Sequence, residues 1–185
     1  HGIAWSLHNE KETSLLFPVG DVTKERPVLQ RRMKGLEDIG SNIDSPEAKE
    51  VKALMGSMPP DSMKPVFEGI GKYSNYCHGT HVAGIASRGN PFARVLAARI
   101  TFDYHMIPEK PTKELAAADA RAAQETVNFF KQNGVRVVNM SWGGSLRSIE
   151  EDLEANNAGG TPEERKALAR EIYQISRDGL FNALK

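Results

Sequence analysis

Helix-forming and strand-forming patterns alternate along the chain from residue 78 to its end. Residues 78–87 are small and compatible with a helix, and residues 94–100 are a short, largely apolar strand candidate. An alanine-rich helix is predicted over 112–132, a β-branched strand over 135–140, and a last helix from Thr161 onward. This order implies βαβ units. It predicts an α/β fold with a partial doubly wound parallel sheet whose strands are covered by helices.

Capping sequences place the starts of three helices. Ser45-Pro46-Glu47 predicts an N-cap, a first-turn proline and an early acid for a helix that ends near Gly56. Thr112 can cap the helix over 112–132, and Thr161-Pro162-Glu163-Glu164 has the form of a capping box. Residues 57–76 are rich in turn formers, so we expect no regular element there. Residues 15–20 contain Pro18 and are at best an edge strand.

The balance of charge excludes some classes of partner. The chain has 24 basic and 24 acidic residues, so no net charge draws it to nucleic acid or to an anionic membrane. No apolar run is long enough to span a bilayer. Cys77 is the only cysteine, and no internal disulfide can form. The chain starts without an initiator methionine and stops inside a helical pattern, so we expect both ends to be cuts through a longer protein.

The run CHGTHVAG at residues 77–84 carries the clearest chemical signal. A general base must present its imidazole from rigid backbone, and small residues after His78, at a helix start, would allow close packing behind it. Residues 75–85 (NYCHGTHVAGI) resemble the histidine segment of the subtilisin-like serine peptidases, the subtilases. The resemblance implies that His78 is the general base for peptide-bond cleavage. It also implies that His81 is a structural histidine beneath the site.

A second segment, VRVVNMSWGG at residues 135–144, resembles the subtilase strand that leads into the substrate cleft. The resemblance implies that Ser141, Trp142 and Gly143 form one wall of the first specificity pocket. An extended backbone at this point can pair with a substrate strand, and glycine permits a close approach. Taken alone, the segment would also suit an ordinary strand followed by a glycine turn.

The resemblance divides the chain into two parts. Residues 75–185 correspond to the central part of a subtilisin-like catalytic domain, and residues 90–100 resemble the proline-led strand after the histidine helix. Residues 1–74 show no clear match. We expect them to be an enlarged connection between the catalytic aspartate and histidine, carrying a mainly helical insertion.

Two members of the expected Asp-His-Ser triad have no clear counterpart in the chain. The aspartate motif of the family, Asp-Thr-Gly or Asp-Ser-Gly, does not occur, and Asp21 is a weak candidate because it lacks the glycine turn. The serine motif is also missing, since Ser57 precedes the histidine and Ser141 lies on the substrate strand. The family's oxyanion asparagine would follow residue 185. We therefore expect the isolated chain to be inactive.

No cofactor or metal is expected. Only three residues separate Ser87 from Pro91, too few for a calcium loop with six or more oxygen ligands. An alternative makes Cys77, His78 and His81 zinc ligands, although no second ligand pair with zinc-like spacing is evident. Metal analysis of the purified chain separates the two interpretations.

The sequence is thus interpreted as part of a serine endopeptidase that acts on proteins or extended peptides. The alternative is a non-catalytic protein-interaction remnant of a pseudoprotease, which an intact Asp and Ser motif in the complete gene would exclude. We expect the chain's first partner to be the remainder of its own catalytic domain. Open sheet edges predict self-association unless residues 1–74 cover them. Family resemblance alone suggests a secreted or cell-envelope protein.

Overall fold

The computed structural model describes residues 2–17 and 19–185, with the backbone alone at residues 21–23. The described chain forms two compact units. The first comprises residues 2–16, 81–103 and 107–185, and the second comprises 17, 19–80 and 104–106. The long helix α3 (Pro60–Ser87) contributes its first part to the second unit and its last residues to the first.

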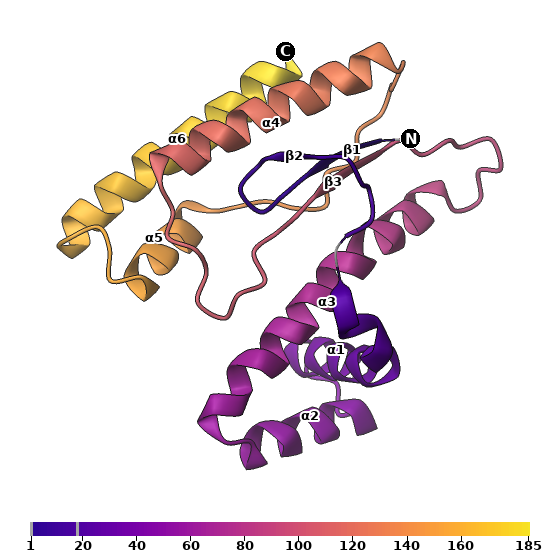
Figure 1. Ribbon diagram of the computed structural model, residues 1–185, viewed down its shortest axis with the longest axis vertical. Helices are drawn as coiled ribbons and strands as arrows, with labels where there is room; N and C mark the ends of the chain where they lie inside the picture. The colour runs from indigo at the N-terminus through magenta and orange to yellow at the C-terminus, as the bar shows by residue number, and fades with distance from the viewer. Residues whose placement is uncertain (1, 18) are drawn as a thin grey trace. The chain divides into compact units, whose positions relative to one another are not determined.

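A small mixed sheet forms one layer of the first unit (Figure 1). Its strands are β1 (Gly2–Trp5), β2 (Lys11–Glu12) and β3 (Ala97–Ile100), in the order β2-β1-β3. The pairing of β1 with β3 is parallel, whereas β1 and β2 are antiparallel neighbours. The predicted α/β class is therefore seen as helices with a small mixed sheet that holds one parallel pair. The expectation of an all-parallel sheet is wrong for these strands, because β2 turns back to pair antiparallel with β1.

One face of this sheet packs against helix α4 (Lys113–Gln132). Ile3 and Trp5 alternate along β1 on that face and meet Ala122 in a buried cluster, with Ile100 opposite Trp5 in the parallel register. The indole N–H of Trp5 donates a hydrogen bond to Thr126 Oγ1 at 2.8 Å. This bond satisfies the one polar group that the buried indole brings into the cluster.

The opposite face of the sheet holds an ion pair above the small side chain of Ala4. Ala4 lies between Arg99 of β3 and Glu12 of β2 in the register, and its side chain is too short to keep them apart. The guanidinium of Arg99 donates to the Glu12 carboxylate and to Thr101 Oγ1. Burial lowers the pKa of Arg99, and the carboxylate offsets that cost by pairing with the buried charge.

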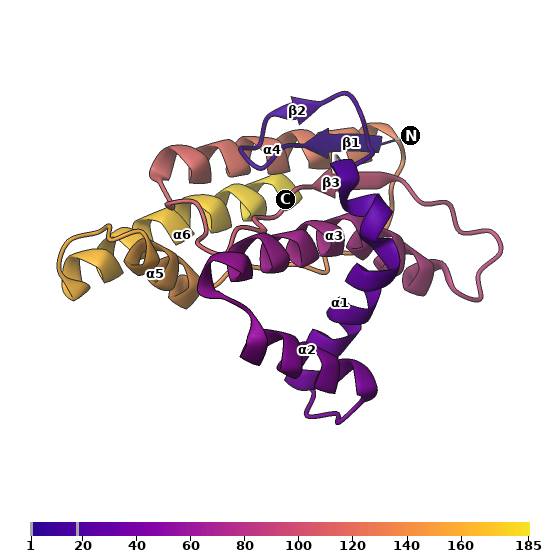
Figure 2. The ribbon, with the colours of Figure 1, turned by 60° about the horizontal axis from the view of Figure 1, so that its bottom comes forward.

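Helices α4 and α6 (Pro162–Leu184) lie side by side in the first unit, as Figures 1 and 2 both show. Gly179 of α6 faces Ala120 of α4 so closely that an added Cβ would lie 2.2 Å from the alanine Cβ. Helix α5 (Leu146–Ala155) packs on α6 and buries Leu153. The sequence did not indicate α5.

The three helix starts predicted from capping sequences are confirmed. Ser45, Thr112 and Thr161 each accept a backbone N–H three residues ahead, from Ala48, Leu115 and Glu164. Thr161 and Glu164 form the reciprocal capping box. The predicted end of the second helix near Gly56 also holds, because α2 spans Pro46–Ser57.

The second unit is mainly helical. It contains the 3-10 helix η1 (Gly20–Glu25), α1 (Arg26–Gly40), α2 and most of α3. Its core joins Leu29 of α1 to Ile70 and Tyr73 of α3, with Cys77 packed against the cluster. The expected helical character of this part of the chain is thus observed.

Two predicted local structures are wrong. Residues 60–76 belong to α3, although Gly69, Gly71 and Asn75 suggested turns. Burial of Ile70 and Tyr73 against Leu29 outweighs the weak helix propensity of the intervening residues. The run 135–140 is not a strand within residues 19–185, and Val137 is 85% exposed. Both edges of β1 are already paired, by β2 and β3, so this run has no place beside that strand.

None of the helices in the described part of the chain is long and apolar enough to cross a membrane.

Candidate active site

His78 projects from the interior of helix α3, not from a helix start as the sequence suggested. The imidazole belongs to an exposed stretch that continues through Gly79, Thr80 and His81. Because α3 begins at Pro60, the histidine is supported by backbone hydrogen bonds on both sides along the helix. Such a site holds the Cα of His78 rigidly and leaves its ring open to solvent.

The residue before the histidine is half-buried. Cys77 packs against the cluster of Leu29, Ile70 and Tyr73, as expected of a small apolar side chain. Burial, together with a hydrogen bond between the phenol and the Cys77 sulfur, raises the pKa of the Tyr73 phenol. The phenol therefore stays neutral at physiological pH, and the cluster anchors α3 one residue from His78.

The small residues after His78 are not used for close packing in this structure. A Cβ atom placed at Gly79 or Gly84 would meet nothing within 4 Å outside its own helix turns. The predicted tight packing behind the histidine is therefore wrong at these two glycines. The helix tolerates both because glycine costs only about 0.5–1 kcal/mol relative to alanine in a helix interior.

The segment Ser141-Trp142-Gly143 lies in the first unit as exposed, non-helical backbone ahead of α5. Ser141 Oγ accepts a hydrogen bond from Asn139 Nδ2 at 2.9 Å. The Trp142 indole lies against the ring of Phe102, with centroids 6.4 Å apart and an interplanar angle of 49°. Phe102, which follows β3, is a neighbour of the predicted wall that sequence reasoning missed.

Gly143 and Gly144 complete the segment with an open backbone. A Cβ atom at either position would meet no atom within 4 Å. The chain's own packing therefore does not require glycine here. Ser145 follows at once as the N-cap of α5, in a reciprocal box with Ser148.

A polar loop follows the carboxyl end of β3, which is also the end where β1 leaves the sheet. The His8 ring lies 3.0 Å from Glu109 Oε2, and the backbone N–H of Glu109 donates to Asp103 Oδ2 at 2.7 Å. Burial, with the nearby negative charge of Asp103 and Glu151, raises the pKa of Asp152. Carboxyl ends of parallel strands are common ligand positions, yet no sequence motif marked these side chains.

The predicted site residues fall into two groups. Ser141, Trp142 and Gly143 lie together in the first unit, and His78 lies in the second. The side chain of the weak candidate Asp21 is outside the described residues. Within residues 2–17 and 19–185, no three His, Cys, Asp or Glu side chains whose positions are described converge as a metal site, so the zinc arrangement of Cys77, His78 and His81 is not formed there.

Comparison with protein families places these residues in context. The sequence model of the subtilase family matches residues 61–177. This span covers more than half of the chain and includes both His78 and Ser141–Gly143. No curated protein and no solved structure gives a significant match. The matched span supports a serine peptidase origin for the chain. The chain belongs to the subtilase family.

Proposed function

We propose that this chain is part of a serine endopeptidase that hydrolyses peptide bonds in proteins through an Asp-His-Ser triad. The observation that carries the proposal is the family match over 61–177, which spans the histidine motif and the expected substrate segment together. Of the triad, this chain supplies the histidine. The aspartate and serine belong to the remainder of the parent protein.

His78 acts as the general base in this proposal. Its imidazole accepts the proton of the serine hydroxyl as the oxygen attacks the peptide carbonyl, and it then delivers that proton to the leaving amine. The solvent-exposed position of His78 on α3, anchored through Cys77, supports the role because a base must reach its nucleophile from a fixed backbone.

Ser141, Trp142 and Gly143 align the substrate in this proposal. The exposed backbone at Gly143 and Gly144 leaves room for an extended peptide to pair with it. The Trp142 indole, braced by Phe102, offers an apolar wall for a substrate side chain. The exposed apolar side chains Val137, Val138 and Met140 lead into this wall. They support a further expectation, that the isolated chain self-associates or docks on the rest of its catalytic domain.

The isolated chain is inactive in this proposal because it supplies no nucleophile for His78 to deprotonate. By family membership, the parent protein is secreted or located in the cell envelope. The rival function, a protein-interaction remnant of a pseudoprotease, differs in one respect that can be measured. It has no reactive serine anywhere in the complete reading frame.

Labelling with a fluorophosphonate probe tests the proposal. The protein encoded by the complete reading frame should take up one equivalent of probe on a serine outside residues 1–185. The chain alone should remain unlabelled. Heat-denatured protein serves as the control for non-specific acylation. Absence of label on the folded complete protein would favour the interaction remnant. Stoichiometric labelling of the chain alone would refute the assignment of the nucleophile to the remainder.

A further inference from the structure

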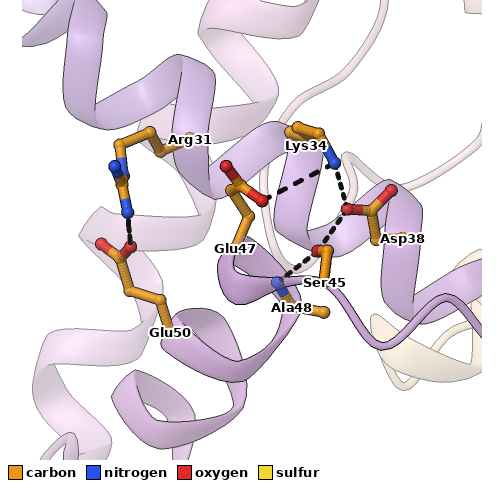
Figure 3. A network of polar contacts seen from close by, with 7 residues as sticks. All are labelled: Arg31, Lys34, Asp38, Ser45, Glu47, Ala48 and Glu50. Carbon is orange, nitrogen blue, oxygen red and sulfur yellow. Dashed lines mark hydrogen bonds and ion pairs between the residues drawn. The ribbon is translucent and has the colours of Figure 1, made fainter.

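The junction between α1 and α2 is built around one buried carboxylate, shown in Figure 3. Asp38, on the last turns of α1, accepts hydrogen bonds from Lys34 Nζ and from Ser45 Oγ. Ser45 is itself the N-cap of α2 and accepts the backbone N–H of Ala48 at 3.0 Å. One carboxylate thereby connects the end of α1 to the first turn of α2.

Close packing surrounds this carboxylate. Asp38 and Ser45 are each 8% exposed. Gly35, one helical turn before Asp38, faces α2 so tightly that a Cβ there would lie 2.4 Å from the carbonyl oxygen of Glu47. Because the two helices meet at backbone distance at Gly35, the buried side chains of Asp38 and Ser45 have little room to move aside.

The charges that face Asp38 come from both helices. Lys34 of α1 also lies 3.7 Å from Glu47 Oε2 of α2, and the Arg31–Glu50 pair joins the same two helices farther along. Hydrogen bonds from Lys34 and Ser45 lower the pKa of Asp38 from its ordinary value of 3.8. A carboxyl with a depressed pKa stabilises the folded state above its unfolded pKa, and that stabilisation disappears as pH falls through its folded pKa.

We propose that Asp38, Lys34 and Ser45 form an acid-released latch that opens the α1–α2 junction when the Asp38 carboxylate takes up a proton. Protonation removes the charge that holds Lys34 and that complements the positive end of the α2 dipole. The N-cap at Ser45 is then held by a weaker, neutral hydrogen bond. The first turn of α2 and the connection 41–45 open while the rest of the chain stays folded. The latch lies before the family-matched span, so it does not depend on the peptidase assignment.

Hydrogen exchange and carboxyl NMR on the whole chain test the latch. The Ala48 amide should lose protection, corrected for intrinsic exchange, as pH falls below 3.8, with a midpoint equal to that of the Asp38 carboxyl carbon. Asp38→Asn should lower Ala48 protection at neutral pH by at least about threefold. It should also abolish the further loss of protection as pH falls. Asp44→Asn is the matched control, because Asp44 forms an exposed pair with Lys49 beside the same cap. It should keep the wild-type pH dependence of Ala48 protection.

Two results would overturn the latch. In one, Asp38→Asn keeps both the wild-type protection of the Ala48 amide and its wild-type loss at low pH. In the other, the Asp38 carboxyl titrates at or above 3.8 in the folded chain. If Asp38→Asn fails to fold, Ser45→Ala decides the question. Loss of the Ser45 donor should shift the Asp38 titration upward and weaken Ala48 protection, and an unchanged titration would contradict the proposed connection.

Discussion

Gly179→Ala is expected to destabilise the first unit although alanine is the better helix former. The new Cβ would lie 2.2 Å from Ala120 Cβ and 2.9 Å from Ala120 Cα, so α6 must move away from α4. Overpacking of this kind costs about 1–3 kcal/mol, whereas glycine to alanine in a helix interior gains about 0.5–1 kcal/mol. The clash is with a backbone-attached carbon, which cannot rotate aside, so the cost should exceed the gain.

Gly84→Ala is the matched control, because a Cβ at Gly84 meets nothing within 4 Å and this position also lies in a helix of the first unit. It should gain only the stability that comes from the higher helix propensity of alanine. The free energy of unfolding of Gly179→Ala should therefore fall about 1–3 kcal/mol below that of the control. Urea denaturation followed by circular dichroism measures both.

The double variant Ala120→Gly, Gly179→Ala moves the methyl group from one helix to the other. It should recover most of the loss, because the clash disappears while the summed helix propensity stays the same. Equal stability of Gly179→Ala and Gly84→Ala would contradict the predicted clash. A double variant no more stable than Gly179→Ala would contradict it as well.

Three further changes test other parts of the structure. Leu153→Ala should cost about 2–5 kcal/mol in urea denaturation, because Leu153 is 1% exposed between α5 and α6; a cost below that of an exposed leucine such as Leu184 would contradict this packing. Thr161→Ala should cost about 0.5–2 kcal/mol by loss of the α6 capping box, and Thr161→Ser should restore it. Burial raises the pKa of Asp119, and a hydrogen bond from Ser176 opposes that rise. The ionised carboxyl therefore destabilises the fold above its unfolded pKa. This cost is relieved as pH falls through the folded pKa. Asp119→Asn should therefore have the higher melting temperature at pH 7, and the difference from wild type should shrink on acidification.

Local signals in the sequence were sufficient for three of the helices, α2, α4 and α6. Ser45, Thr112 and Thr161 each combine a capping side chain with a following helix-forming run, and each cap is observed. Such signals act over three or four residues and need no tertiary partner. Helix α5 was missed because its start at Ser145 follows a glycine pair, which was interpreted as the end of a strand.

Long-range packing decided the elements that were missed or predicted wrongly. Strand β1 has four residues and no clear alternation, and it is held by β2, β3 and the contact of Trp5 with α4. Helix α3 continues through Pro65 because the buried contacts of Ile70 and Tyr73 lie beyond it. Residues 135–140 have strong strand propensity, yet a strand exists only where a neighbour pairs with it. None of these partners can be identified from local sequence.

The candidate site was predicted from motif resemblance and not from local physics. The resemblance located His78 and Ser141–Gly143, and the family match spans both. It did not indicate that His78 lies inside a long helix or that Phe102 contacts Trp142. Both facts depend on segments far apart in the sequence.

The role of His78 is tested most directly by the kinetics of the complete protein on a protein substrate, with His78→Ala compared with wild type. A general base contributes about 10²–10⁴-fold to the rate, so His78→Ala should lower kcat by about 10²-fold or more. KM should change little. His8→Ala, at an exposed histidine paired with Glu109, should retain wild-type activity. Full activity in His78→Ala would contradict the assignment of this histidine as the general base.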